Sequence, residues 1–465
     1  MRKKLIVALI ACSASFILER EAEACGGCFI PTENPTVVTD HRMILSVSKE
    51  QSTLYDQIRY TGEPSSFAWV LPVSGTVEVG LSADIVFASL DGLTATSIIP
   101  PPQNCPPAPN CQSGNSLGRG TSDSAAGGGE VTVTKREVVG PYETVQLKAT
   151  DPAALQSWLA ANNFTVPPDV QPVVNQYVTE KFDFLALKLI PGKDVKDMRP
   201  VRVTTKGAVA VLPLRMVAAG TGPVVGISLW IVGEGRYEPQ NFPSFIIATD
   251  EIAWDWTQSK SNYTEIRAAR TTAGGGRAWE IESSTLVQRG DIENAIRTGF
   301  VPTPGGGRPG GAPQNPDDQY LPVQDAQGAV TKSAEQVRAE DLTTLTYGVP
   351  SASLRITRMR ADLAHAALDV DLVMTASQDQ AVLSNVRQLT KELNEPLCPV
   401  WNGCDPAGTA PRSEAAARSG GNESFSCSTA VTTIQRTSPA WIGLGAAFGA
   451  LAVVQAIRRI RRNTK

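Results

Sequence analysis

The sequence predicts an α+β, strand-rich ectodomain with a few helices, followed by one C-terminal transmembrane helix. Short segments rich in β-branched or aromatic residues, such as 67–71 and 182–189, end at proline or glycine and are typical of strands. Helical spacing of apolar residues is confined to a few stretches. An apolar run at 441–457 is just long enough to cross a bilayer as a helix.

The first 24 residues have the features of a secretory signal peptide. Arg2, Lys3 and Lys4 precede an apolar core, and Ala22-Glu23-Ala24 forms a small-residue cleavage site. Cleavage between Ala24 and Cys25 is therefore expected. An alternative is a lipoprotein signal that ends at Cys12, although the apolar run continues beyond that cysteine.

The region after the signal contains strands, a hairpin and a helix. Residues 131–139 and 142–149 flank Gly140-Pro141, a turn dipeptide that indicates a hairpin. Asp151 is a predicted N-cap, with Pro152 at the first helical position. Further strands are expected between 201 and 249, and together these elements predict a main domain at 25–300.

Three stretches contain much Gly, Pro or Ser and are predicted to be loops or linkers. Residues 100–129 interrupt the strands as an insertion. Residues 301–319 link the main domain to a smaller α+β segment at 320–404, which is expected to pack on it. Residues 405–439 are predicted to form a flexible stalk before the membrane helix at 440–457.

A second helix is predicted near the end of the smaller segment. Ser377 and Gln380 have the spacing of a capping box, and Pro396 marks the stop. An apolar stripe at helical spacing runs between them: Val382, Val386, Leu389 and Leu393.

The basic tail at 458–465 predicts the orientation of the membrane helix. Arg458, Arg459, Arg461 and Arg462 follow the apolar run directly, as a cytoplasmic stop-transfer signal does. The part before the helix is then extracytoplasmic. An alternative is a cleaved sorting signal built from Cys427, the apolar helix and the arginines.

Charge argues against a nucleic-acid partner. The formal net charge is −4, and nine of the 42 Lys and Arg residues lie in the signal region or the C-terminal tail, so the ectodomain is acidic. Nucleic-acid binding requires clustered cations. A protein or a surface polymer is the expected partner, besides the membrane around the C-terminal helix.

Eight cysteines are present, and Cys12 lies within the signal. Exported cysteines usually form disulfides. Tight loops at 105–111 and 398–404 favour the local pairs Cys105/Cys111 and Cys398/Cys404, but many pairings remain open. The seven disulfide candidates are Cys25, Cys28, Cys105, Cys111, Cys398, Cys404 and Cys427.

Cys25-Gly26-Gly27-Cys28 is the most specific local motif. Such a pair can be a redox dithiol where a helix N-terminus lowers the pKa of the first thiol, but Pro31 does not favour a long helix here. Structural disulfides are the preferred interpretation, with a metal or redox site and a free thiol as alternatives.

Other candidate residues have simpler structural explanations. His41 and His365, the two histidines, lie outside catalytic motifs, and the 114–118 match to a nucleophile elbow falls in the low-complexity insertion. Trp254 and Trp256 could stack on sugars, but core packing explains them as well. A cation site at Asp362, Asp369 and Asp371 is less favoured than solvated strand ends. No catalytic residue, metal site or cofactor is predicted.

The ordered motifs resemble a bacterial family of exported proteins, domain of unknown function 2330. The resemblance is based on five segments, which are 24–29 after the signal peptide, 60–73, 139–159, 184–191 and 354–363. It implies a bacterial envelope protein and supplies no catalytic residues.

These observations predict a membrane-anchored envelope protein whose ectodomain is a non-enzymatic binding or structural unit. The rival hypothesis is a hydrolase or thiol redox enzyme with a site formed only in three dimensions. A pocket that gathered His41, carboxylates or the Cys25/Cys28 pair would favour this rival.

Overall fold

The computed structural model describes residues 28–29, 38–57, 68–107, 138–148, 151–161, 170–193, 197–218, 221–298, 320–324, 328–402 and 405–419. The predicted signal peptide, membrane helix and basic tail lie outside these residues. No helix in the described part of the chain is long and apolar enough to cross a membrane. The strand-rich α+β class is confirmed for the described residues.

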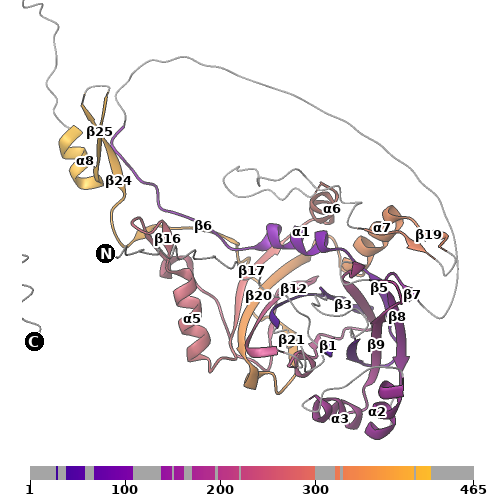
Figure 1. Ribbon diagram of the computed structural model, residues 1–465. Helices are drawn as coiled ribbons and strands as arrows, with labels where there is room; N and C mark the ends of the chain where they lie inside the picture. Colours follow the sequence, from indigo (N-terminus) through magenta and orange to yellow (C-terminus); the bar gives the residue numbers. More distant parts are fainter. Residues whose placement is uncertain are drawn as a thin grey trace, which may run out of the picture.

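An eight-stranded mixed sheet forms the centre of the molecule (Figure 1). Its strand order is β14 (Ser244–Phe245), β17 (Trp279–Leu286), β20 (Leu354–Ala364), β12 (Thr221–Glu234), β2 (Val38–Val47), β3 (Gln51–Asp56), β10 (Val201–Lys206) and β5 (Glu78–Leu81). The β12–β2 and β14–β17 pairs are parallel and the others are antiparallel.

A five-stranded antiparallel sheet packs against the β3–β10–β5 end of the large sheet. Its order is β1 (Cys28–Phe29), β4 (Ala68–Val73), β9 (Asp183–Leu189), β8 (Tyr142–Leu147) and β7 (Val138–Val139). Period-two alternation explains the packing. Trp69, Leu71 and Val73 face the large sheet, whereas Val70 faces α2 (Pro152–Ala161) and α3 (Gln171–Thr179).

Helices cover the opposite face of the large sheet. Helices α1 (Asp84–Thr94), α6 (Arg289–Thr298) and α7 (Ala334–Leu345) pack on Ile44, Trp230 and Ile356. The five-stranded sheet covers only part of the other face of the large sheet. The remainder of that face is covered by α4 (Leu214–Val217) and by the small sheet β11 (Val211–Leu212), β21 (Leu372–Ala376) and β13 (Tyr237–Pro239).

The remaining elements are small. They are α5 (Tyr263–Ala273), the 3-10 helices Thr249–Glu251 and His365–Ala367, the hairpin β18 (Val323–Gln324) with β19 (Val330–Lys332), and the parallel pair β6 (Ser97–Ile99) with β22 (Val386–Gln388). A further group consists of the sheet β16 (Lys260–Ser261), β15 (Ala253–Asp255) and β23 (Lys391–Glu392), the hairpin β24 (Leu397–Asn402) with β25 (Asp405–Pro411), and α8 (Arg412–Ser419).

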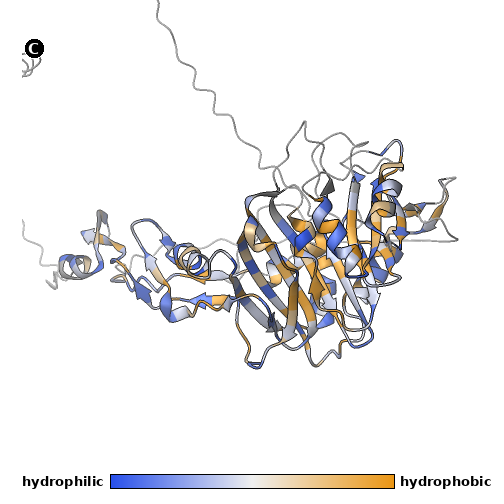
Figure 2. Cartoon of the chain, turned by 90° about the horizontal axis from the view of Figure 1, so that it is seen from below, coloured by the Kyte–Doolittle hydropathy of each residue, from blue (hydrophilic) through white to orange (hydrophobic). Residues whose placement is uncertain are grey.

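We call this last group of three strands, hairpin and α8 the arm. It lies to one side of the two large sheets, whose strands carry most of the apolar residues (Figures 1 and 2).

The predicted hairpin and first helix are confirmed within the described residues. Val139 pairs with Tyr142 across the turn, where Gly140 has a φ of 59°, a value that favours glycine. The Asp151 carboxylate accepts a hydrogen bond from the backbone N–H of Ala153 at 3.2 Å, as an N-cap does.

The predicted helix between Ser377 and Pro396 is wrong. This segment forms β22 and β23, and Val382 and Leu393 are 58% and 62% exposed. The Gln380 side chain accepts a hydrogen bond from the backbone N–H of Arg236 and donates one to its carbonyl, so it joins a neighbouring turn instead of closing a capping box.

The described segments after residue 300 do not match the predicted arrangement, in which a smaller segment packs on the main domain and a flexible stalk follows it. Strand β20 is inserted between β12 and β17, in the interior of the large sheet. Residues 405–419, expected in the stalk, form β25 and α8. Pairing with β24 supplies the backbone hydrogen bonds of β25, whose sequence gave no reason to expect a strand.

Candidate functional site

The disulfide pairing differs from the predicted local loops. Cys105 bonds to Cys398, with 5.4 Å between their Cα atoms, although 293 positions separate them. The local pairs Cys105/Cys111 and Cys398/Cys404 are therefore wrong. The parallel β6–β22 pair explains the long-range link, because it brings the segments leading to the two cysteines side by side.

Of the other five cysteine candidates, only Cys28 lies within the described residues. Cys25, Cys111, Cys404 and Cys427 lie outside the described residues, as do the cleavage residue Ala24 and the four stop-transfer arginines. The backbone of Cys28 lies in β1, opposite Trp69 of β4. This register attaches the second cysteine of the Cys-Gly-Gly-Cys motif to the five-stranded sheet.

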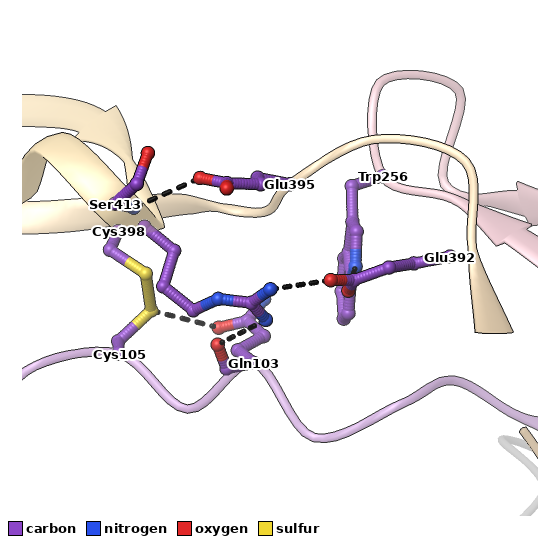
Figure 3. The surroundings of a disulfide bond; sticks show 8 residues. Gln103, Cys105, Trp256, Glu392, Glu395, Cys398 and Ser413 are labelled. Carbon is purple, nitrogen blue, oxygen red and sulfur yellow. Dashed lines mark hydrogen bonds and ion pairs between the residues drawn. A yellow bond between two sulfur atoms is a disulfide. The ribbon is translucent and has the colours of Figure 1, made fainter. Parts of the chain in front are cut away.

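Polar contacts around the disulfide hold the arm together (Figure 3). Glu392 accepts a hydrogen bond from the Trp256 indole at 2.9 Å and one from Arg412 at 2.5 Å. The Arg412 guanidinium lowers the pKa of Glu392, and the indole bond adds to this shift. Glu395 accepts a hydrogen bond from the backbone N–H of Ser413 at 2.9 Å, which attaches α8 to the connection between β23 and β24.

Trp254 and Trp256 pack against each other and do not form a flat platform. Their rings are edge to face, with centroids 6.0 Å apart and an interplanar angle of 70°. Both are half-buried, and Trp254 packs on the small apolar cluster around Ile252 and Tyr263. This geometry favours the packing role over stacking on sugars.

The three candidate aspartates are held by different arginines. Asp362 lies near Arg267 and Arg360, and Asp369 pairs with Arg277 at 3.0 Å. Asp371 pairs with Arg215 at 2.6 Å and also accepts from the Tyr177 hydroxyl. Within the described residues no group of three His, Cys, Asp or Glu side chains has metal-binding geometry.

A buried carboxylate fixes α7 to the large sheet. Asp341 accepts hydrogen bonds from Ser82 at 2.6 Å, Tyr320 at 2.9 Å and Arg202 at 3.0 Å. Burial raises the pKa of Asp341, and the guanidinium of Arg202 opposes that shift. Because its charge is matched and its oxygens have partners, this site is structural.

A second charged network lies on the same face of the sheet. Arg358 of β20 pairs with Glu282 of β17 and Asp91 of α1. Glu280 accepts a hydrogen bond from the Tyr263 hydroxyl at 2.5 Å, and burial raises the pKa of Glu280 to about 7. These pairs join α1, α5 and the two strands.

Asp56 differs from these paired carboxylates. It ends β3, is 4% exposed, and its Oδ1 atom has no hydrogen-bond partner. Burial raises its pKa to about 7. It lines a hollow of about 10 Å³ between the two large sheets, where the other described lining residues are apolar.

A larger cavity adjoins this hollow. Its volume is about 110 Å³, and the two spaces share Leu54, Leu71 and Pro213 as walls. The sequence reasoning missed this site. The available signal was an Asp two residues after Leu54 in a strand, because such a position faces the same side as the apolar residue.

The two histidines occupy different settings. His41 lies on β2, beside Ile227 of β12, and burial lowers its pKa to about 3, so it is neutral at physiological pH. His365 is exposed, with its Nε2 atom 3.3 Å from the carbonyl of Ala218. Met43 pairs with Asp56, so His41 is a diagonal neighbour of Asp56 on one sheet face.

Comparison with known proteins identifies a family. The model of a family described as an uncharacterized protein conserved in bacteria, DUF2330, matches residues 20–291, more than half of the chain. The chain belongs to the DUF2330 family. The DUF2330 match includes seven strands of the large sheet and ends before β20 and α7.

Other comparisons add little. No curated protein matches the chain. Among solved structures, baculovirus P35 matches with a TM-score of 0.24 and 10% identity, over 43% of this chain and 65% of that chain. The chain thus spans slightly less than two thirds of that protein, and a TM-score of this size does not indicate a shared fold.

Proposed function

We propose that the protein is exported and membrane-anchored in the bacterial cell envelope, and that its ectodomain binds another protein or a surface polymer without catalysing a reaction. The disulfide-tied arm is the observation that carries this proposal. Cys105 and Cys398 join distant segments, and such bonds persist in oxidising compartments outside the cytoplasm.

The surface of the arm supports a role in binding. Leu393 and Leu397 are 62% and 63% exposed, and they lie on either side of Glu395, which holds α8. Large apolar residues that are exposed on a segment held in place by hydrogen bonds are suited to contact a binding partner. The hydrogen bonds of Glu392 and Glu395 pre-organise this surface, which lowers the entropy lost on binding.

Site-specific photo-crosslinking in cells tests the proposal. A photoreactive residue at Leu397 is expected to capture a discrete envelope component, and the same residue at Leu286 serves as the control. Leu286 is 53% exposed but lies on β17 in the large sheet. Reduction of the disulfide before illumination is expected to weaken the capture at 397. Equal capture at both positions, or capture of cytoplasmic proteins alone, would contradict the proposal.

A further inference from the structure

We propose that the space between the two large sheets is a binding site for a small apolar molecule that carries one hydrogen-bond-donating group, an ammonium or a hydroxyl, which bonds to Asp56. This site is separate from the arm and does not depend on the function proposed for the arm.

The exposure of the residues that line the larger cavity decreases from an open mouth to a buried end. At the mouth, Ser74 is exposed and Val211 is 37% exposed. Deeper walls include Leu45 and Val203, which are almost fully buried. A ligand that enters at the mouth therefore leaves water progressively, along a lining that is mainly apolar and includes Ser52 and Thr205.

The volume limits the ligand to a short apolar body. The larger cavity measures about 110 Å³. An apolar cavity of about 150 Å³ in another protein binds benzene. A chain of roughly four carbons is therefore a suitable size by this comparison.

Asp56 specifies the polar end of the ligand. Its Oδ1 atom is buried and has no partner, unlike the carboxylate of Asp341, which has three. A buried acceptor without a donor is costly, so a donor that reaches it gains a strong hydrogen bond. The 10 Å³ hollow beside it holds about one water, which would find few polar partners there.

Leu54 lies between the two spaces. It lines both of them, together with Leu71 and Pro213, and it is only half-buried. Rotation of its side chain would connect the larger cavity to Asp56. Among charged groups, Asp371 also lines the larger cavity, but Arg215 and Tyr177 already engage its oxygens.

Fluorine NMR of the full-length protein tests the site with two probes, trifluorobutanol and trifluorobutylamine. Each probe has a four-carbon body and one donor, and we expect a saturable bound signal from at least one of them. The probe that binds more tightly shows whether the site prefers a hydroxyl or an ammonium group.

Two variants locate the binding. Asp56→Leu removes the acceptor while adding apolar bulk, so it should weaken the tighter probe by roughly tenfold or more. Val211→Trp blocks the mouth at an exposed position, leaves Asp56 in place, and should cause a similar loss. The proposal is overturned if neither probe gives a saturable signal with the wild-type protein, or if both variants bind as the wild type does.

Discussion

At the scale of single residues, the described interior contains carboxylates that bond to arginines and a buried carboxylate, that of Asp56, whose Oδ1 atom has no hydrogen-bond partner. Asp341 and Glu282 are buried against arginines, so their negative charges are matched. Asp56 faces a hollow whose other described lining residues are apolar. A structural role for Asp341 and a ligand-binding role for Asp56 follow from this contrast, because an unmatched buried acceptor costs stability unless something binds it.

Asp56→Asn should change how stability depends on pH. The pKa of Asp56 is about 7 in the fold, against an ordinary value of 3.8. Between these values the folded protein binds more protons than the unfolded chain, so its free energy of unfolding falls as pH rises. Between pH 5 and pH 8, the free energy of unfolding of Asp56→Asn should therefore rise by about 3 kcal/mol relative to that of the wild type.

Urea titration at the two pH values measures this difference. Glu280, whose pKa is also raised to about 7, titrates in both proteins and cancels in the comparison. A stability difference that is the same at pH 5 and pH 8 would show that Asp56 is not a desolvated acid.

Asp341→Ala should be strongly destabilising. It would leave Arg202 buried, with its side chain 5% exposed, and it would remove the acceptor of Ser82 and Tyr320. Breaking such a buried pair costs about 3–5 kcal/mol. The matched control is Glu265→Ala, which breaks the exposed Lys260–Glu265 pair and should cost less than about 1 kcal/mol. Denaturant unfolding measures both costs. Equal losses in the free energy of unfolding for Asp341→Ala and Glu265→Ala would contradict the structural role of Asp341.

At the scale of elements, the arm depends on its disulfide more than the sheets do. The buried cluster beneath α8 consists of Cys398, Ala410 and Ala415, which is too small to hold the hairpin and helix alone. Cys398→Ser should therefore raise amide hydrogen exchange in β24, β25 and α8 while β12 and β20 keep their protection. Unchanged exchange in the arm would mean that its ion pairs and hydrogen bonds suffice.

The sequence predicts elements well where local pattern and tertiary environment agree. The β-branched and aromatic residues at 67–71 and the N-cap at Asp151 both lead to the correct element. It fails at 377–393, where apolar spacing fits a helix but Gln380 bonds to the distant Arg236. It also fails for Cys105, since the parallel β6–β22 pair that aligns it with Cys398 has no local signal.

At the scale of the whole molecule, the large sheet requires residues beyond the family match. Strand β20 lies between β12 and β17 and contributes the buried Ile356, Met359 and Leu363. A chain that ends after α6 should not fold, because β12 and β17 would each lose one of their two neighbouring strands. Addition of a second fragment, 320–419, should restore structure. A soluble, cooperatively unfolding 25–300 fragment would contradict this account.

We propose that the protein is exported to the bacterial cell envelope and that the Cys105–Cys398 disulfide ties its arm in place. The most direct test is mass spectrometry of the protein from its native membrane fraction, alkylated before any reduction. The account predicts a chain that starts at Cys25 and a peptide pair joined through Cys105 and Cys398. A chain that retains Met1 with both cysteines alkylated as free thiols would contradict it.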